Sequence, residues 1–198
     1  MTLIKILAAA ILTCAGSLWI EKLYSRSGEL TFPKKISSRS KFRKPILFCM
    51  LAIFLLMAKN IWATAAIFLL VLITLTDFEQ YMIFDAMTLP LAIIGAIYSW
   101  QNSILLENFL AALVGGGIFL LLAIISKGAL GGGDVKLIAA LGLWFGCQKL
   151  LNVVLDGAIA GGVVALILIF AKKKTRSSYF AYGPYFALSA IYYLTVGA

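Results

Sequence analysis

Histidine is absent from the 198-residue sequence, and cysteine and acidic residues are scarce. Without histidine the chain can form neither a Ser-His-Asp nor a Cys-His nucleophile, and it lacks the usual ligand of metal sites. The three cysteines, Cys14, Cys49 and Cys147, stand alone inside apolar runs and form no CxxC pair. We therefore predict no metal site, no disulfide framework and no cofactor, and we interpret the cysteines as small packing residues.

Charged residues are also few, at 13% of the chain, whereas 63% of the residues are hydrophobic. A soluble domain is about half apolar and about a quarter charged. A core of this size cannot hide so much apolar surface from water, so the excess must face lipid. The composition predicts an all-α polytopic membrane protein.

A membrane-spanning helix needs roughly 20 mostly apolar residues. The candidate spans are Leu3–Ile20, Pro45–Ala58, Ile61–Thr76, Ala86–Trp100, Leu106–Ser126, Asp134–Leu150, Leu151–Ala171 and Ala181–Val196. Two of these segments are short and the break at Lys59–Asn60 is weak, so we predict about eight transmembrane helices within a range of six to eight. The basic cluster follows the first apolar run, which favours a retained span over a cleaved signal peptide.

The 17 Lys and Arg residues are distributed unevenly over the predicted loops. With eight spans, fourteen of them fall on the side that carries the segment 21–44, and only Lys5, Lys59 and Lys149 fall on the other. Positive residues accumulate on the cytoplasmic side of membrane proteins. We therefore predict that both termini are non-cytoplasmic, and the net charge of +9 needs no nucleic-acid partner to explain it.

The segment 21–44 is the only long polar stretch. It is too short for a domain with its own core. We predict a single integral-membrane domain over residues 1–198, in which 21–44 is a basic cytoplasmic loop that lies along the lipid surface.

Acidic residues near the predicted membrane boundary are the candidates for chemistry, because ionisable groups at membrane depth are costly. Asp77 follows an uninterrupted apolar run, and Asp134 closes the run Gly131-Gly132-Gly133-Asp134. Both fall on the predicted cytoplasmic side, as do Glu79 and Asp85. Simpler readings stay open: Asp134 as a helix N-cap, Asp77 as a water-facing helix end, and the other two as solvated loop charges.

Two aspartates at helix ends suggest a catalytic pair. Two adjoining carboxyl groups cannot easily both ionise, so they share one proton. One then accepts a proton from water while the protonated partner polarises a scissile carbonyl. The glycines before Asp134 let backbone approach closely and leave backbone groups for an extended peptide to pair with.

Small residues also recur at helix-packing spacing, in Gly142xxxGly146 and Gly157xxxGly161. We interpret these glycines as helix contacts.

Three segments together resemble the type IV prepilin peptidases. The segment LTDFEQYMIFDAMTLPL, residues 75–91, resembles the family's first active-site region. The segment GGGDVKLIAALGLWFG, residues 131–146, is similar to its GxGD motif, and AYGPYFALSA, residues 181–190, to its late Gly-Pro segment. Gly16-Ser17-Leu18 is similar to the Gly-Ser-Phe of the first helix in the family.

The resemblance implies an aspartic endopeptidase of the bacterial inner membrane whose active site faces the cytoplasm. It would cut the basic leader from type IV prepilins or type II secretion pseudopilins. By motif, Asp77 and Asp134 would be the catalytic pair, supported by Gly131, Gly133 and Lys136. Glu79 and Asp85 are possible contacts for the basic leader.

The sequence departs from the family pattern at two places. Phe84 stands where the family has proline before Asp85. Many members also carry a zinc-binding insert with two CxxC pairs and methylate the new N-terminus, whereas the segment 21–44 contains no cysteine. We therefore expect a peptidase without methyltransferase activity. Two other functions stay open: a small proton- or cation-coupled transporter that uses Asp77, Asp134 and Asp156, and a non-catalytic assembly factor.

Overall fold

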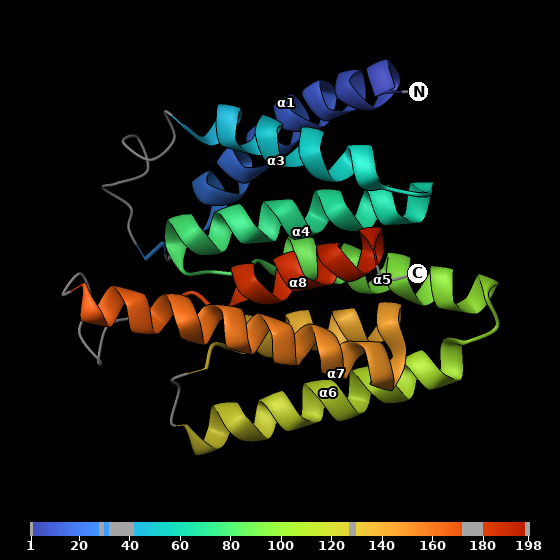
Figure 1. Cartoon of the computed structure of the whole chain (residues 1–198), viewed down its shortest axis with the longest axis vertical. Helices are drawn as coiled ribbons and strands as arrows, with labels where there is room; N and C mark the ends of the chain where they lie inside the picture. Colours follow the sequence, from blue (N-terminus) through green and yellow to red (C-terminus); the bar gives the residue numbers. More distant parts are fainter. Residues whose placement is uncertain (1, 28–29, 32–41, 127–129, 172–179, 197–198) are drawn as a thin grey trace.

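The computed structural model describes residues 2–27, 30–31, 42–126, 130–171 and 180–196. Within these residues the chain forms seven α-helices and no strand (Figure 1). They are α1 (Thr2–Arg26), α3 (Arg43–Met57), α4 (Ile61–Gln80), α5 (Asp85–Gln101), α6 (Leu105–Ile125), α7 (Gly132–Phe170) and α8 (Gly183–Thr195). The predicted all-α fold is confirmed.

Four of the described helices, α1, α4, α6 and α7, are long and apolar enough to cross a membrane. The helices α3, α5 and α8 contain 15, 17 and 13 residues, at or below the lower limit of about 17 for a span. The chain is therefore a polytopic membrane protein by length and composition. The number of about eight spans stays a prediction.

The long helix α7 is divided at Gly146, which has φ 67° and ψ 178°. The sequence predicts two spans that meet at Leu150–Leu151, so the predicted boundary is wrong. The break requires glycine, because φ is positive and an added Cβ would lie 2.9 Å from Asn108 Oδ1. Carbonyls before a break lose their helical partners, and the Leu143 carbonyl accepts bonds from Asn108 Nδ2 at 3.0 Å and from Ser99 Oγ instead.

The second arm of α7, after Gly146, runs back toward the beginning of α8 (Figure 1). Gly157 packs against Phe186 of α8, and Gly161 packs against Tyr182 just before that helix. In the first arm, Gly142 lies against the backbone of Ala112 in α6. The packing role predicted for these three glycines is confirmed, whereas Gly146 forms the break.

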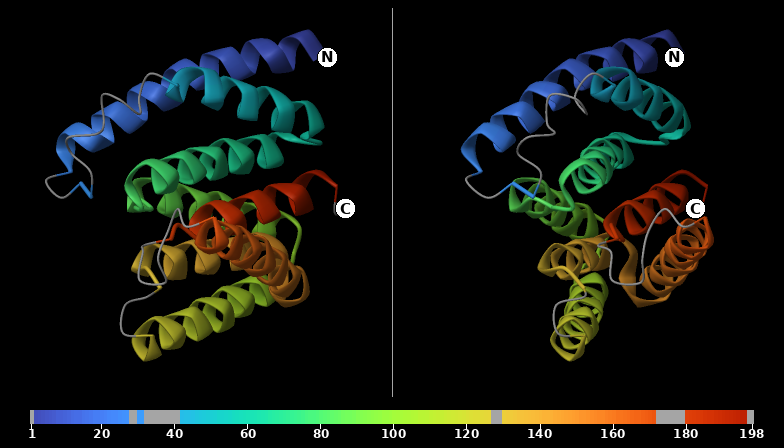
Figure 2. Two further views of the ribbon diagram at one scale, coloured as in Figure 1. Left: turned by 60° about the vertical axis from the view of Figure 1, so that its left-hand side comes forward. Right: turned by 90° about the vertical axis from the view of Figure 1, so that its left-hand side faces the viewer.

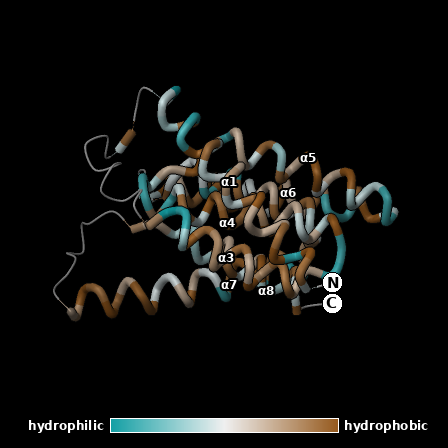
Figure 3. Tube along the Cα trace, turned by 90° about the horizontal axis from the view of Figure 1, so that it is seen from above, coloured by the Kyte–Doolittle hydropathy of each residue, from teal (hydrophilic) through white to brown (hydrophobic). Residues whose placement is uncertain are grey.

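Helix α4 is the centre of the fold. It packs against α1, α3, α5 and α8, and it lies between them when the molecule is viewed along its helices (Figure 2, right). Much of the outer surface is apolar, especially on α6 and on the second arm of α7. Hydrophilic residues gather mostly toward the helix ends (Figure 3). Cys14, Cys49 and Cys147 are exposed, so our interpretation of them as packing residues is wrong.

The polar stretch 21–44 is partly helical. Helix α1 continues through Glu21 to Arg26, and α3 already begins at Arg43. The predicted loop is therefore shorter than expected, and residues 28–29 and 32–41 of it lie outside the described residues. Helix α1 continues because its last turns make specific contacts. Ser17 donates to Glu21 within α1, Glu21 lies near Arg43 of α3, and Tyr24 donates to Glu79 of α4.

The helix ends fall into two groups. The beginning of α1 and the end of α8 lie at one end of the molecule (Figure 1), where Lys5 Nζ donates to the Ala58 carbonyl at 2.7 Å. The end of α4 and the beginnings of α5, α7 and α8 lie at the opposite end. This second end holds Asp77 and Asp134.

The break at Gly146 leads to a test of stability. Gly146→Ala places a Cβ at positive φ and against Asn108 Oδ1, so we expect a loss of more than about 1 kcal/mol in the free energy of unfolding. Gly162→Ala in the same helix is the matched control, because its Cβ meets nothing within 4 Å. Thermal unfolding in detergent measures both, and equal melting temperatures for the two variants would contradict the assignment of the break.

Candidate active site

Asp77 lies in the last turn of α4. Its side chain is buried, with the residue 6% exposed. The helix ends just beyond it because Tyr81 adopts a left-handed conformation with φ 53°. The Tyr81 N–H donates to the Asp77 carbonyl at 2.9 Å, which is the helix's terminal hydrogen bond.

Asp134 lies in the first turn of α7. The N-cap of this helix is Gly131, so Asp134 is the third helical residue and is not the N-cap itself. Its carboxylate reaches back toward the Gly131 backbone, where a Cβ on Gly131 would lie 3.3 Å from Oδ2. A carboxylate in this position is stabilised by the partial positive charge and the free N–H groups of a helix beginning. The other carboxylate oxygen, Oδ1, is buried and has no partner among the described residues.

The two carboxylates lie close enough to interact electrostatically. The backbone of Gly183 at the beginning of α8 lies against the Asp77 carboxylate. Helix beginnings carry partial positive charge and free N–H groups, so the starts of both α7 and α8 favour carboxylates here. The structure thus brings together the three sequence segments that contain Asp77, Asp134 and Gly183.

Two glycines make this convergence possible. A Cβ at Gly133 would lie 2.8 Å from Ile83 Cβ, in the connection between α4 and α5. A Cβ at Gly183 would lie 2.8 Å from Ile83 Cδ1 and 2.6 Å from Asp77 Oδ2. Backbone therefore packs directly against Ile83 and the Asp77 carboxylate.

Lys136 and Asp85 form an ion pair beside the aspartates. Lys136 Nζ donates to both carboxylate oxygens of Asp85 at 2.7 Å, and both side chains are more than half exposed. The pair joins the second turn of α7 to the beginning of α5. Asp85 thus has the exposed position that the sequence predicts.

Glu79 does not have the solvated loop position considered for it. It is 8% exposed and paired with Arg43 of α3 at 2.9 Å. Arg43 cannot be recognised from the sequence, because it is one of several cations in a basic stretch and nothing distinguishes it. Gly183 is not predicted as a site residue either, although the late Gly-Pro segment carries the signal.

No group of three or more Asp, Glu or Cys side chains close enough to hold a metal ion occurs within the described ranges. The fold and the site together define a helical membrane protein with two interacting aspartates at helix ends. The sequence model described as the type IV leader peptidase family matches residues 63–166, which include both aspartates. The chain belongs to this family.

Similar proteins carry the name prepilin leader peptidase/N-methyltransferase. The one from Pectobacterium carotovorum subsp. carotovorum is 35% identical over 132 residues, covering 63% of this chain and 47% of the relative. The one from Xanthomonas campestris pv. campestris is 31% identical over 122 residues, covering 57% of this chain and 42% of the relative. The one from Neisseria gonorrhoeae is 32% identical over 127 residues, covering 61% of this chain and 43% of the relative. The chain thus spans about half the length of the curated relatives that it matches. No solved structure matches the chain at a significant level.

The glycine run before Asp134 provides a matched pair of variants. Gly133→Ala forces a Cβ against Ile83, and we expect a loss of about 1–3 kcal/mol in the free energy of unfolding. Gly132→Ala meets nothing within 4 Å and replaces glycine by a better helix former, so we expect no loss. Denaturation of the purified variants in detergent compares them. Similar stabilities would mean that Ile83 yields to the new methyl group.

Proposed function

We propose that this protein is a membrane aspartic endopeptidase that removes the basic leader peptide from type IV prepilins or type II secretion pseudopilins. The proposal is supported by family membership and by the names of the relatives. The observation that carries the mechanism is the meeting of Asp77 and Asp134, with a buried Asp134 oxygen that lacks a partner among the described residues. Buried polar atoms are nearly always hydrogen-bonded, so this oxygen is suited to a reacting water.

The chemistry needs only the two carboxyl groups and a water molecule. One carboxylate accepts a proton from the water, whose oxygen attacks the scissile carbonyl carbon. The other carboxyl group, protonated, donates its hydrogen bond to the carbonyl oxygen and stabilises the charge that develops there. Collapse of the tetrahedral intermediate breaks the C–N bond, and the leaving amine takes a proton from the site.

The active site would face the cytoplasm at the inner membrane. The support is the charge distribution, because the segments predicted to lie at the Asp77 end hold fourteen of the 17 basic residues. A prepilin has its basic leader on that side and an apolar helix in the bilayer, so the cut falls at their junction. Two aspartates at helix ends suit this position better than the mid-membrane site that a transport path favours.

Asp85 is the better candidate of the two acidic residues expected to contact the leader. Its carboxylate is exposed, and its partner Lys136 is exposed too, so a leader cation could compete for it. Glu79 is buried with Arg43. We propose no methyltransferase activity, because the polar stretch 21–44 contains none of the cysteines that hold zinc in the longer members.

A cleavage assay in detergent tests the proposal. It pairs a prepilin from the same genome with the wild type, Asp77→Asn and Asp134→Asn, and follows the mobility shift on a gel. We expect each variant to lose at least about 100-fold in rate, because general acid–base catalysis contributes roughly that much or more.

Asp156→Asn is the control. Asp156 lies in the second arm of α7, where it accepts a hydrogen bond from the Tyr193 hydroxyl at 2.8 Å, and it should keep wild-type activity. Full activity in either Asp77→Asn or Asp134→Asn would contradict the two-aspartate mechanism. A folded wild type that cleaves none of the encoded prepilins would contradict the proposed peptidase function.

A further inference from the structure

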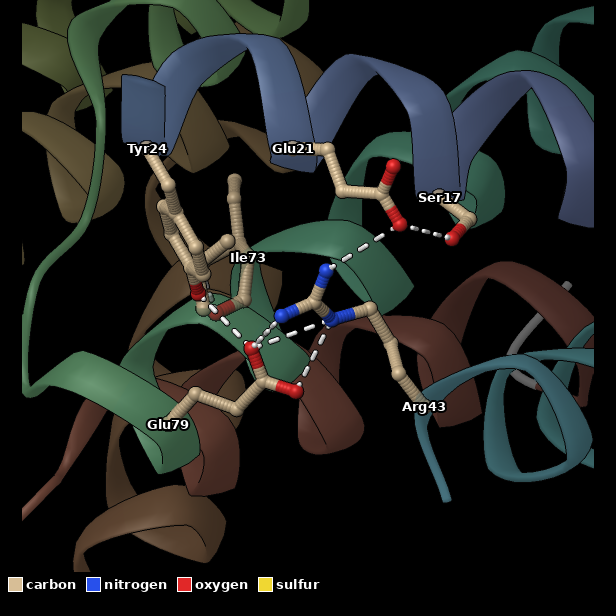
Figure 4. Close-up of polar contacts among 7 residues, drawn as sticks. Ser17, Glu21, Tyr24, Arg43, Ile73 and Glu79 are labelled. Atoms are coloured by element: carbon tan, nitrogen blue, oxygen red, sulfur yellow. Dashed lines mark hydrogen bonds and ion pairs between the residues drawn. The ribbon is translucent and has the colours of Figure 1, made fainter. Parts of the chain in front are cut away.

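A cluster of buried charge lies beside the site and has no part in the proposed chemistry. Arg43 at the beginning of α3 is 2% exposed, and Glu79 in the last turn of α4 is 8% exposed. Tyr24 of α1 completes what we call the Arg43 cluster: Arg43, Glu79 and Tyr24. Figure 4 shows the guanidinium lying between Glu79 and the helix that carries Glu21 and Tyr24.

The contacts within the Arg43 cluster are numerous. Arg43 Nε donates to both oxygens of Glu79, at 3.0 and 3.2 Å, and Nη2 donates to Oε2 at 2.9 Å. The Tyr24 hydroxyl donates to the same Oε2 at 2.9 Å, and its ring centroid lies 5.2 Å from Arg43 Cζ. Glu21 adds a longer contact, with Oε1 3.9 Å from Arg43 Nη1. Three helices are thus joined through one guanidinium.

Neither charge is placed by the preferences of its own helix. A helix beginning disfavours a cation and a helix end disfavours an anion, yet Arg43 begins α3 and Glu79 lies in the final turn of α4. Burial of an ion pair also carries a large desolvation cost. Each residue therefore occupies its position because of its partner, and the pair fixes one arrangement of α3 and α4.

The turn of α4 that this pair fixes is the turn that carries Asp77. Glu79 follows Asp77 by two residues, and residues at that spacing point to different sides of a helix. Arg43 binds the turn on one side through Glu79, and the Gly183 backbone packs against it on another at Asp77. Helix ends otherwise fray, and a displacement of about 1 Å in a catalytic group can cost about 100-fold in rate.

We infer that the Arg43 cluster holds the last turn of α4 so that Asp77 faces Asp134, which makes Arg43 and Glu79 positioning residues of the site. The inference rests on the proposed function for its kinetic test. It concerns the placement of Asp77 and assigns no contact between the cluster and substrate.

The test compares variants that change the pair with one that weakens the same helices elsewhere. The double variant Arg43→Gln with Glu79→Gln removes both charges together. Neither charge of the pair is then left buried without its partner, so we expect the variant to fold. Arg43→Lys keeps the charge and loses the two-pronged contact. Lys5→Met is the control, because Lys5 joins α1 to the far end of α3 through the Leu56 and Ala58 carbonyls, away from Asp77.

Prepilin cleavage and thermal stability are measured for each folded variant. We expect the double variant to lose about 10- to 100-fold in kcat, with KM changed less than about twofold, because substrate binding is intact and only Asp77 is displaced. Arg43→Lys should fall between it and the wild type. Lys5→Met should lower the melting temperature and keep wild-type kcat. Wild-type kcat in the folded double variant would overturn the inference, as would an equal loss of kcat in Lys5→Met.

Hydrogen exchange separates this inference from the proposed function, since it needs no substrate. Amides of residues 78–81 should exchange at least about 10-fold faster in the double variant than in the wild type, and Lys5→Met should leave them protected. If the wild type cleaves no prepilin, the proposed function fails and exchange alone decides. Faster exchange then supports the positioning of α4, and unchanged exchange overturns it.

Discussion

The close approach of backbone to the Asp77 carboxylate is the contact on which the arrangement of helix ends depends. Gly183 lies against the Asp77 carboxylate, and Gly133 and Gly183 both pack on Ile83. A Cβ at either glycine would come within 3.0 Å of Ile83 or of the Asp77 carboxylate, so these close contacts require the absence of a side chain. With glycine there, two helix beginnings direct their partial positive charge at two carboxylates, which offsets part of the cost of burying them.

The interior of the bundle contains several buried polar side chains, and some of them are satisfied within their own helix. Thr13, Thr74 and Thr195 each donate to the carbonyl four residues earlier, at 2.7, 2.8 and 2.9 Å. This bond is available within any helix and needs no tertiary partner. The charged groups differ, because Arg43 and Glu79 can be satisfied only across helices. Their pairing therefore specifies a tertiary arrangement that the threonines do not.

The sequence predicts the helical class, and it points to Asp77 and to the glycine run before Asp134 as candidates, because long apolar runs and isolated aspartates are local signals. It does not predict the break at Gly146. A glycine inside an apolar run looks the same whether it packs against a helix or turns the chain, and only the positive φ distinguishes the two. The Arg43–Glu79 pair is also hidden, because its partners are 36 residues apart and Arg43 stands among other cations.

The two aspartates are supported unequally. Each is followed two residues later by a charged residue with a partner on a neighbouring helix: Glu79 pairs with Arg43 and Lys136 pairs with Asp85. The first pair is buried, and breaking it would leave an uncompensated charge inside the protein. The second is exposed, and pairs of that kind contribute about 0–1 kcal/mol. The end of α4 is consequently the fixed part of the site. The beginning of α7 is placed against it chiefly by the packing of Gly133 on Ile83. The position of Asp77 therefore depends on a buried ion pair, and the position of Asp134 depends on close backbone packing.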